Sequence, residues 1–229
     1  MKILTLALWL ISSCVFAQNK ESYHVINILG ATTYSTPDFD AQIIGRIDFG
    51  KILYFEKVLD KTSKKRVSTE LELEGNWIKI ILHSSYGYIF SSDLSIKPTE
   101  LIIDHNDLQT VNLLGKELER EKTTEEVTGE FGTFPLVKIK TKFERAILNE
   151  EISDGCHSWK YTLEGFTLSE AYHQLINLTS GKYTNQIEIP ATISRKGNVW
   201  NFSNLDAIQE LKLHDLGDGK FKITLYSCT

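Results

Sequence analysis

Residues 23–96 alternate between short apolar stretches and turn residues, and no helical period of 3.6 residues is sustained along them. Strand-length stretches begin at Tyr23, Ile43, Lys51 and Trp77. Five or so short strands within about 75 residues are typical of a small barrel closed around one core. We therefore predict a β-barrel in this part of the chain.

The turns and strands of this stretch follow one another in a characteristic order. They run through Tyr34-Ser35-Thr36-Pro37, residues 43–47, residues 49–53, residues 75–80, and Tyr86-Gly87-Tyr88-Ile89 with Leu94. This ordered set resembles the bacterial SH3 (SH3b) family over residues 23–96, about a third of the chain. The resemblance implies an SH3-like small barrel, and relatives that bind cell-wall peptides suggest a ligand of that kind.

Two departures separate this chain from that family. Ala31-Thr32-Thr33-Tyr34 stands where the family often carries Leu-Asn-Val-Arg, and an insertion over residues 58–73 lengthens the central hairpin. The insertion holds a basic run, residues 61–66, and then an alternation from Val67 to Leu73 that predicts a strand with one wet face. We interpret the basic run as a solvated hairpin tip, with teichoic acid or phospholipid phosphates as the alternative. Both departures alter the ligand surface of the family, so ligand identity does not carry over.

Four aromatic residues of the barrel are candidate binding residues. Tyr34, Tyr86 and Tyr88 can form an exposed patch, because tyrosine combines contact area with a polar tip. Trp77 is either a packed barrel side chain or a binding platform, and packing is the commoner role. Gly87 is expected to permit a close backbone approach.

Residues 101–229 predict a second, α+β domain, an antiparallel sheet with one helix, reached through a linker at residues 95–99. The stretch 116–126 is too charged for a buried element, and we predict a surface helix or a mobile loop there. Further on, Val137, Ile139, Thr141 and Phe143 alternate with lysines, as in a strand with one wet face.

Local signals place one helix and one hairpin in this second part. Thr167-Leu168-Ser169-Glu170 is a capping box, and an apolar stripe follows it and ends at Ser180-Gly181. Gly217-Asp218-Gly219 between two alternating stretches predicts a tight hairpin.

The start of the chain predicts export. A lysine, a short apolar run and a small-residue exit make residues 1–17 a secretory signal peptide, and the run is too short to span a bilayer. Alternatively, Ile11-Ser12-Ser13-Cys14 resembles a lipobox in which Cys14 is lipidated. We expect a periplasmic or secreted protein, with an outer-membrane lipoprotein as the alternative. Cys156 and Cys228 then remain as a disulfide candidate.

No constellation of catalytic or metal-binding residues is evident in the sequence. Asp154-Gly155-Cys156-His157-Ser158 superficially resembles a cysteine nucleophile segment, but neighbouring residues of a strand point to opposite faces and cannot form a dyad. The six histidines lack metal-ligand spacing, and nothing indicates a cofactor.

The composition excludes some classes of protein but does not identify a ligand. The chain has 229 residues, 41% hydrophobic and 24% charged, with a net charge of −5, which is ordinary for a folded protein and unlike a strongly basic nucleic-acid binder. We expect a non-catalytic binding module of the bacterial envelope that recognises peptidoglycan or an envelope protein. The alternatives are a secreted cell-wall hydrolase with a catalytic second domain, and a protein-binding inhibitor.

Overall fold

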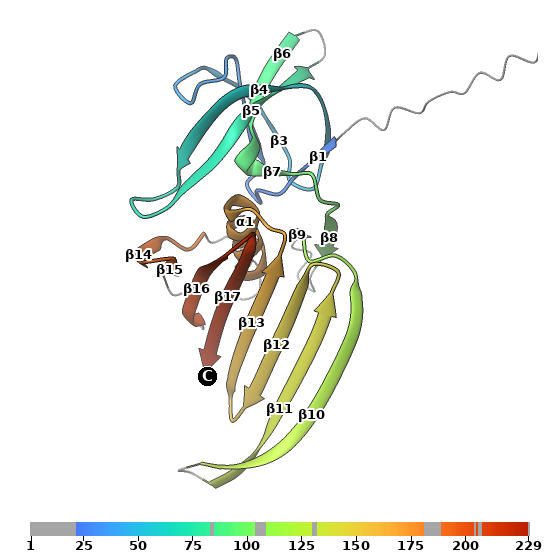
Figure 1. Cartoon of the computed structure of the whole chain (residues 1–229), viewed down its shortest axis with the longest axis vertical. Helices are drawn as coiled ribbons and strands as arrows, with labels where there is room; N and C mark the ends of the chain where they lie inside the picture. The colour runs from blue at the N-terminus through green and yellow to red at the C-terminus, as the bar shows by residue number, and fades with distance from the viewer. Residues whose placement is uncertain are drawn as a thin grey trace, which may run out of the picture.

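The structure, a computed structural model, describes residues 22–82, 85–103, 109–129, 132–180, 189–203, 205 and 208–228. Strands dominate these residues, so the predicted mainly β class is confirmed (Figure 1). The predicted signal peptide over residues 1–17 and the alternative lipidation site Cys14 lie outside the described residues. Within the described ranges, no helix has the length and apolar character that crossing a membrane requires.

The first half of the chain builds a seven-stranded sheet in the order β3-β2-β6-β5-β4-β1-β7. A short 3₁₀ helix, η1 (Ser91–Asp93), precedes its last strand. The strands are β1 (Ser22–Val25), β2 (Ala31–Tyr34), β3 (Ile43–Ile47), β4 (Ile52–Arg66), β5 (Glu72–Leu82), β6 (Ser85–Phe90) and β7 (Leu94–Ser95).

One face of this sheet, the inner face, is a hydrophobic core. Ile78 and Ile80 of β5 and Ile89 of β6 are buried there, because alternate residues of a strand share a face. Gly87 lies on the same face, and a Cβ at this position would come within 2.5 Å of the Thr33 side chain. The close approach predicted for Gly87 is therefore confirmed.

The strand predicted from Val67 is wrong in its first part. Residues 67–70 form a turn in which the backbone N–H groups of Val67 and Ser68 donate to the Leu71 carbonyl. The Ser68 hydroxyl also accepts from the Glu70 N–H, which stabilises the turn locally. The apolar alternation that continues through the turn reflects a strand only from β5 onward, where Leu73 is buried.

The second half builds an eight-stranded sheet in the order β10-β11-β12-β13-β17-β16-β15-β14, and the helix α1 (Leu168–Thr179) packs against its strands β16 and β17 (Figure 1). A separate pair, β8 (Glu100–Ile103) and β9 (Gln109–Asn112), precedes it. The strands of the large sheet are β10 (Glu117–Gly129), β11 (Gly132–Phe143), β12 (Ala146–Ser153), β13 (Cys156–Glu164), β14 (Thr192–Lys196), β15 (Val199–Phe202), β16 (Ile208–Gly217) and β17 (Lys220–Cys228).

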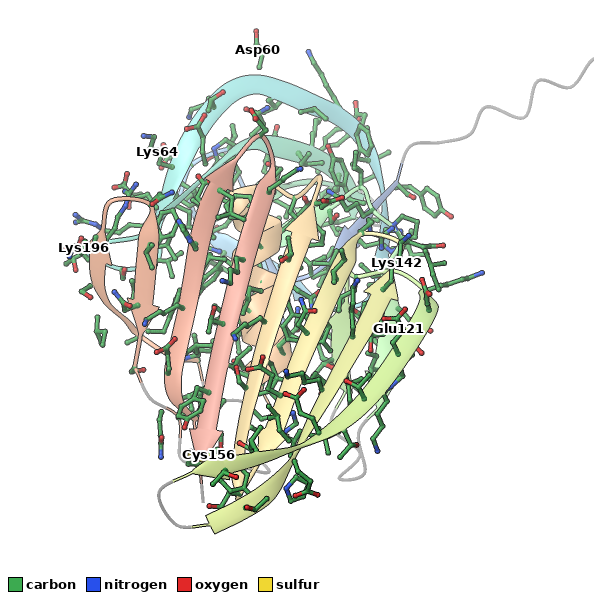
Figure 2. The ribbon with its side chains drawn as sticks, turned by 60° about the horizontal axis from the view of Figure 1, so that its bottom comes forward. Asp60, Lys64, Glu121, Lys142, Cys156 and Lys196 are labelled. Atoms are coloured by element: carbon green, nitrogen blue, oxygen red, sulfur yellow. A yellow bond between two sulfur atoms is a disulfide. The ribbon has the colours of Figure 1, made fainter. Side chains whose placement is uncertain are left out.

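The surface helix or loop predicted over residues 116–126 is wrong, because this stretch forms most of strand β10. β10 pairs only with β11, at the edge of the sheet, and is almost entirely exposed. It therefore needs no apolar alternation. Cross-strand charge pairs stabilise it instead, such as Glu125 with Lys138 at 2.5 Å. Figure 2 shows Glu121 and Lys142 at this end of the sheet.

The capping box, the last hairpin and the disulfide predicted for the second half are confirmed. The Thr167 hydroxyl accepts from the Glu170 N–H at 3.2 Å, and the Glu170 carboxylate accepts from the Thr167 N–H at 2.9 Å, which completes the capping box. Asp218 has a φ of 52° in the turn between β16 and β17. Cys156 and Cys228 face each other in the register of β13 and β17 and form the disulfide, 72 positions apart in sequence.

The two sheets share one hydrophobic core. Ile26 and Leu71 of the first half are buried in the same cluster as Leu175 of α1 and Phe202 of β15. Two hydrogen bonds accompany this contact: the Asn177 amide donates to the Ile26 carbonyl at 3.1 Å, and the Trp200 indole N–H donates to the Glu70 carbonyl at 2.9 Å. α1 therefore lies between the sheets and packs against both of them (Figure 1).

Candidate functional site

The four candidate aromatic residues lie on one face of the first sheet, the outer face opposite the inner core. Tyr34 of β2 pairs with Tyr88 of β6, and Trp77 of β5 pairs with Phe90 of β6. Since alternate residues of β6 share a face, Tyr86 lies on the same side as Tyr88 and Phe90. The fold thus brings together residues that are up to 54 positions apart in the chain.

One end of this face is a closed aromatic cluster. The ring of Phe39 lies 4.8 Å from that of Trp77 and 4.9 Å from that of Phe90, and the Tyr34 ring lies 5.4 Å from Trp77. Trp77 is only 1% exposed, and its indole N–H donates to the Ser63 hydroxyl at 3.3 Å. A binding-platform role for Trp77 is therefore not available in this structure, because its ring offers no surface to a ligand.

The other end of the outer face exposes a row of apolar side chains. Tyr86 is 53% exposed and pairs with Ile81, which is 64% exposed. Tyr54, 63% exposed, directly precedes Phe55, the residue of β4 that pairs with Ile80 of β5. We call Tyr54, Ile81 and Tyr86 the tyrosine row. Single exposed apolar residues are ordinary, but a contiguous set of this kind indicates an interaction surface.

Lys79, whose charge is balanced by a neighbouring carboxylate, lies beside the tyrosine row. The Lys79 ammonium is 3.5 Å above the centre of the Tyr86 ring and 3.1 Å from the Glu56 carboxylate. The hydrogen bond from Lys79 to Glu56, together with the charge of that carboxylate, raises the pKa of Lys79. The lysine therefore restrains the Tyr86 ring through a cation–π contact, while its own charge is balanced by Glu56.

The sequence pattern marks Tyr86 but not Tyr54 or Ile81. A signal is present in the strand alternation, because Tyr54 and Ile81 are large apolar residues at positions expected to face water. Their alignment across β4, β5 and β6 depends on the irregular register of the β4–β5 hairpin, which skips a residue between Phe55 and Lys57.

A second polar cluster joins the two halves. The Asp93 carboxylate accepts from the Lys65 ammonium at 2.8 and 2.9 Å and from the Asn27 amide at 3.0 Å, and it lies 3.6 Å from Nε2 of His173. Burial by itself raises the pKa of Asp93, but His173 and the Lys65 charge outweigh it and lower the pKa to about 2. Burial and the Asp93 charge raise the pKa of Tyr172 to about 12.

The basic run at residues 61–66 is mostly exposed, as predicted, but it lies beside the hairpin tip and not at it. It forms the last part of β4, and the turn of the hairpin follows it at residues 67–70. Lys65 is held by the buried Asp93, and the Lys61 ammonium donates to the Pro37 carbonyl at 2.9 Å. Both lysines therefore have structural partners. The local sequence pattern of the basic run does not predict these long-range contacts.

The cysteine nucleophile hypothesis is excluded by the disulfide, because Cys156 has no free thiolate. Its neighbour His157 instead lies 3.3 Å from the Glu150 carboxylate of β12 and stacks on Trp159, with ring centres 3.6 Å apart. Among the described residues, no group of three His, Cys, Asp or Glu side chains could hold a metal ion.

Comparison of the chain with protein-family models, curated proteins and solved structures gave no match. The resemblance of residues 23–96 to bacterial SH3 domains therefore rests on their own sequence landmarks.

Proposed function

We propose that this chain is an exported bacterial envelope protein that acts as a non-catalytic binding module through an SH3-like first domain. Its ligand is a cell-wall component or an envelope protein. The observation that carries the proposal is the tyrosine row, an exposed apolar surface held on three paired strands. Such a surface contacts a ligand without needing to rearrange, which lowers the entropic cost of binding.

Two further observations support export and a binding role. A disulfide between Cys156 and Cys228 is typical of proteins in oxidising compartments. The predicted signal peptide agrees with that compartment. On the outer face, Tyr54, Ile81 and Tyr86 keep more than half of their surface exposed, whereas Trp77 is 1% exposed.

A retention experiment tests this function. Purified protein is mixed with insoluble peptidoglycan and, separately, with immobilised envelope proteins, and the bound fraction is measured. The double variant Tyr54→Ala/Tyr86→Ala should lose at least tenfold in retention. Ile193→Ala, which removes an equally exposed apolar side chain (63%) from the other sheet, should retain wild-type binding.

Two outcomes would contradict the proposal. One is a wild-type protein that is retained by neither material. The other is a double variant that binds as well as Ile193→Ala. Release of soluble wall fragments during the incubation would instead favour the hydrolase alternative.

A further inference from the structure

A cavity of about 220 Å³ lies at the junction of the two halves, and we call it the junction cavity. Residues of the first sheet, of η1 and of α1 line it. Among them are Leu73 of β5 and Ile176 of α1, each 1% exposed. An apolar cavity of about 150 Å³ holds one benzene molecule, so the junction cavity has room for a ligand body of about six to eight heavy atoms.

Exposed apolar side chains from distant segments also line the junction cavity. They are Leu29 (45% exposed) after β1, Val67 (37%) after β4, and Ile189 (41%) before β14. The Asn27 side-chain oxygen accepts from the Leu29 N–H at 3.0 Å, which holds that turn in place. Large apolar residues that stay exposed around one cavity indicate that the cavity receives an apolar ligand.

The polar residues of the junction cavity form a fixed group. Asp93 and His173, which are 2% and 4% exposed, both line it. The Asp93 oxygens already accept from Lys65 and Asn27, whereas Nε2 of His173 has no hydrogen-bond partner among the described residues and lies 3.6 Å from the Asp93 carboxylate. A mostly apolar cavity with a few convergent polar groups is typical of a small-molecule site.

The charges around the junction cavity favour an anion. Two cations, Lys65 and Arg66, line it against one carboxylate, Asp93. An ammonium has three N–H donors, and Asp93 takes two of those of Lys65. Within the described part of the chain, Arg66 forms no ion pair. Both cations therefore have donors left for a ligand, and a carboxylate is the group that pairs best with them.

From this geometry we propose that the junction cavity binds a small carboxylic acid with an aliphatic body, either a free acid or the C-terminal residue of a peptide. The carboxylate accepts hydrogen bonds from Lys65 and Arg66, and the aliphatic body packs against Leu73 and Ile176. This site is separate from the tyrosine row, so the inference goes beyond the proposed function and does not depend on it.

The test titrates the purified protein with 4-methylpentanoate and follows backbone amide NMR shifts. Shifts should concentrate on Leu29, Val67 and His173, with a dissociation constant of about 1 mM, as expected for a ligand of this size. N-acetyl-leucine should also bind, whereas N-acetyl-leucinamide, which has the same body without the charge, should bind about tenfold more weakly. Tighter binding of N-acetyl-leucine than of 4-methylpentanoate would assign the site to a peptide C-terminus, and the reverse order would assign it to a free acid.

Variants at exposed positions locate the site without disturbing the core. Arg66→Ala should weaken binding of 4-methylpentanoate about five- to tenfold, because it removes one cation from the cavity. Leu29→Trp should weaken it by a similar factor, because the larger side chain occupies the space of the ligand. Lys64→Ala removes an exposed cation of the same strand that does not line the cavity, and should bind as the wild type does. Tyr54→Ala/Tyr86→Ala should also retain full binding.

Three results would overturn the inference: no shifts with 4-methylpentanoate at about 10 mM, equal affinity for N-acetyl-leucine and its amide, or equal losses in Arg66→Ala and Lys64→Ala. The amide spectrum of each variant shows in the same experiment whether it is folded. Retention by envelope material is measured separately, so failure here leaves the proposed function of the tyrosine row unaffected.

Discussion

Asp93 shows how one buried residue can connect distant parts of a chain. Its carboxylate is almost completely buried, and its partners come from β4, from the loop after β1 and from α1. A buried carboxylate without such partners would be protonated or strongly destabilising. The Lys65 ammonium and His173 therefore determine that Asp93 is ionised in the folded state.

Stability should fall in acid because of this residue. The folded pKa of Asp93, about 2, is below its ordinary value of 3.8, so its contribution is complete above pH 4 to 5 and is lost as the pH falls through 2. Between pH 5 and pH 2, urea unfolding of the wild type should lose up to about 2 kcal/mol more than that of Asp93→Asn.

Glu56→Gln is the matched control for Asp93→Asn. It alters an exposed ion pair with Lys79, whose contribution to stability is kept small by solvent screening. Its stability should therefore vary with pH as that of the wild type does. Equal pH dependence in wild type and Asp93→Asn would show that Asp93 is not the group responsible.

At the scale of elements, α1 is stabilised by a residue with two functions. Glu170 completes the capping box with Thr167, and its carboxylate also accepts from the Ser95 hydroxyl and the Lys97 ammonium, each at 2.5 Å. The stretch expected to be a linker is therefore fixed to the N-terminus of the helix. A local helix signal thus has a long-range contact that the capping pattern does not reveal.

Two substitutions separate these functions. Thr167→Ala removes only the cap and should cost about 1 kcal/mol of unfolding free energy. Glu170→Ala also leaves the partly buried Lys97 ammonium without its carboxylate, and should cost about 2–4 kcal/mol. Chemical denaturation of both variants provides the measurement. A cost for Glu170→Ala no larger than that for Thr167→Ala would mean that the contacts with Ser95 and Lys97 add nothing.

At the scale of the whole molecule, the shared core makes the two halves interdependent. Ile26, Ile28, Leu71 and Leu73 are at most 3% exposed and belong to the cluster that includes α1. In the absence of the second half these side chains would meet water, at about 1.5–3 kcal/mol each. A typical domain has a total stability of about 5–15 kcal/mol.

Residues 22–99 expressed alone should therefore not form a stable domain. We expect a poorly dispersed amide NMR spectrum and no cooperative thermal transition, whereas the full chain unfolds cooperatively. A dispersed spectrum with a melting temperature close to that of the full chain would show that the first sheet is independent of the second half.

The sequence by itself determined the features that depend on near neighbours. Alternation of apolar residues with lysines marked β11, Thr167 and Glu170 marked the start of α1, and Asp218 with its glycines marked the last hairpin. The export hypothesis also named the two cysteines that form the disulfide. These features can be predicted from the sequence because a turn, a helix cap or a strand face involves residues only a few positions apart.

Only the tertiary structure decided which distant residues meet. β10 is a strand because β11 pairs with it, and its own charged sequence did not indicate this. Asp93 has its low pKa because Lys65 and His173, 28 and 80 positions away, pack against it. The tyrosine row exists because β4 and β5 pair across an irregular register. Such contacts depend on long-range packing, and the local periodicity of the sequence does not predict them.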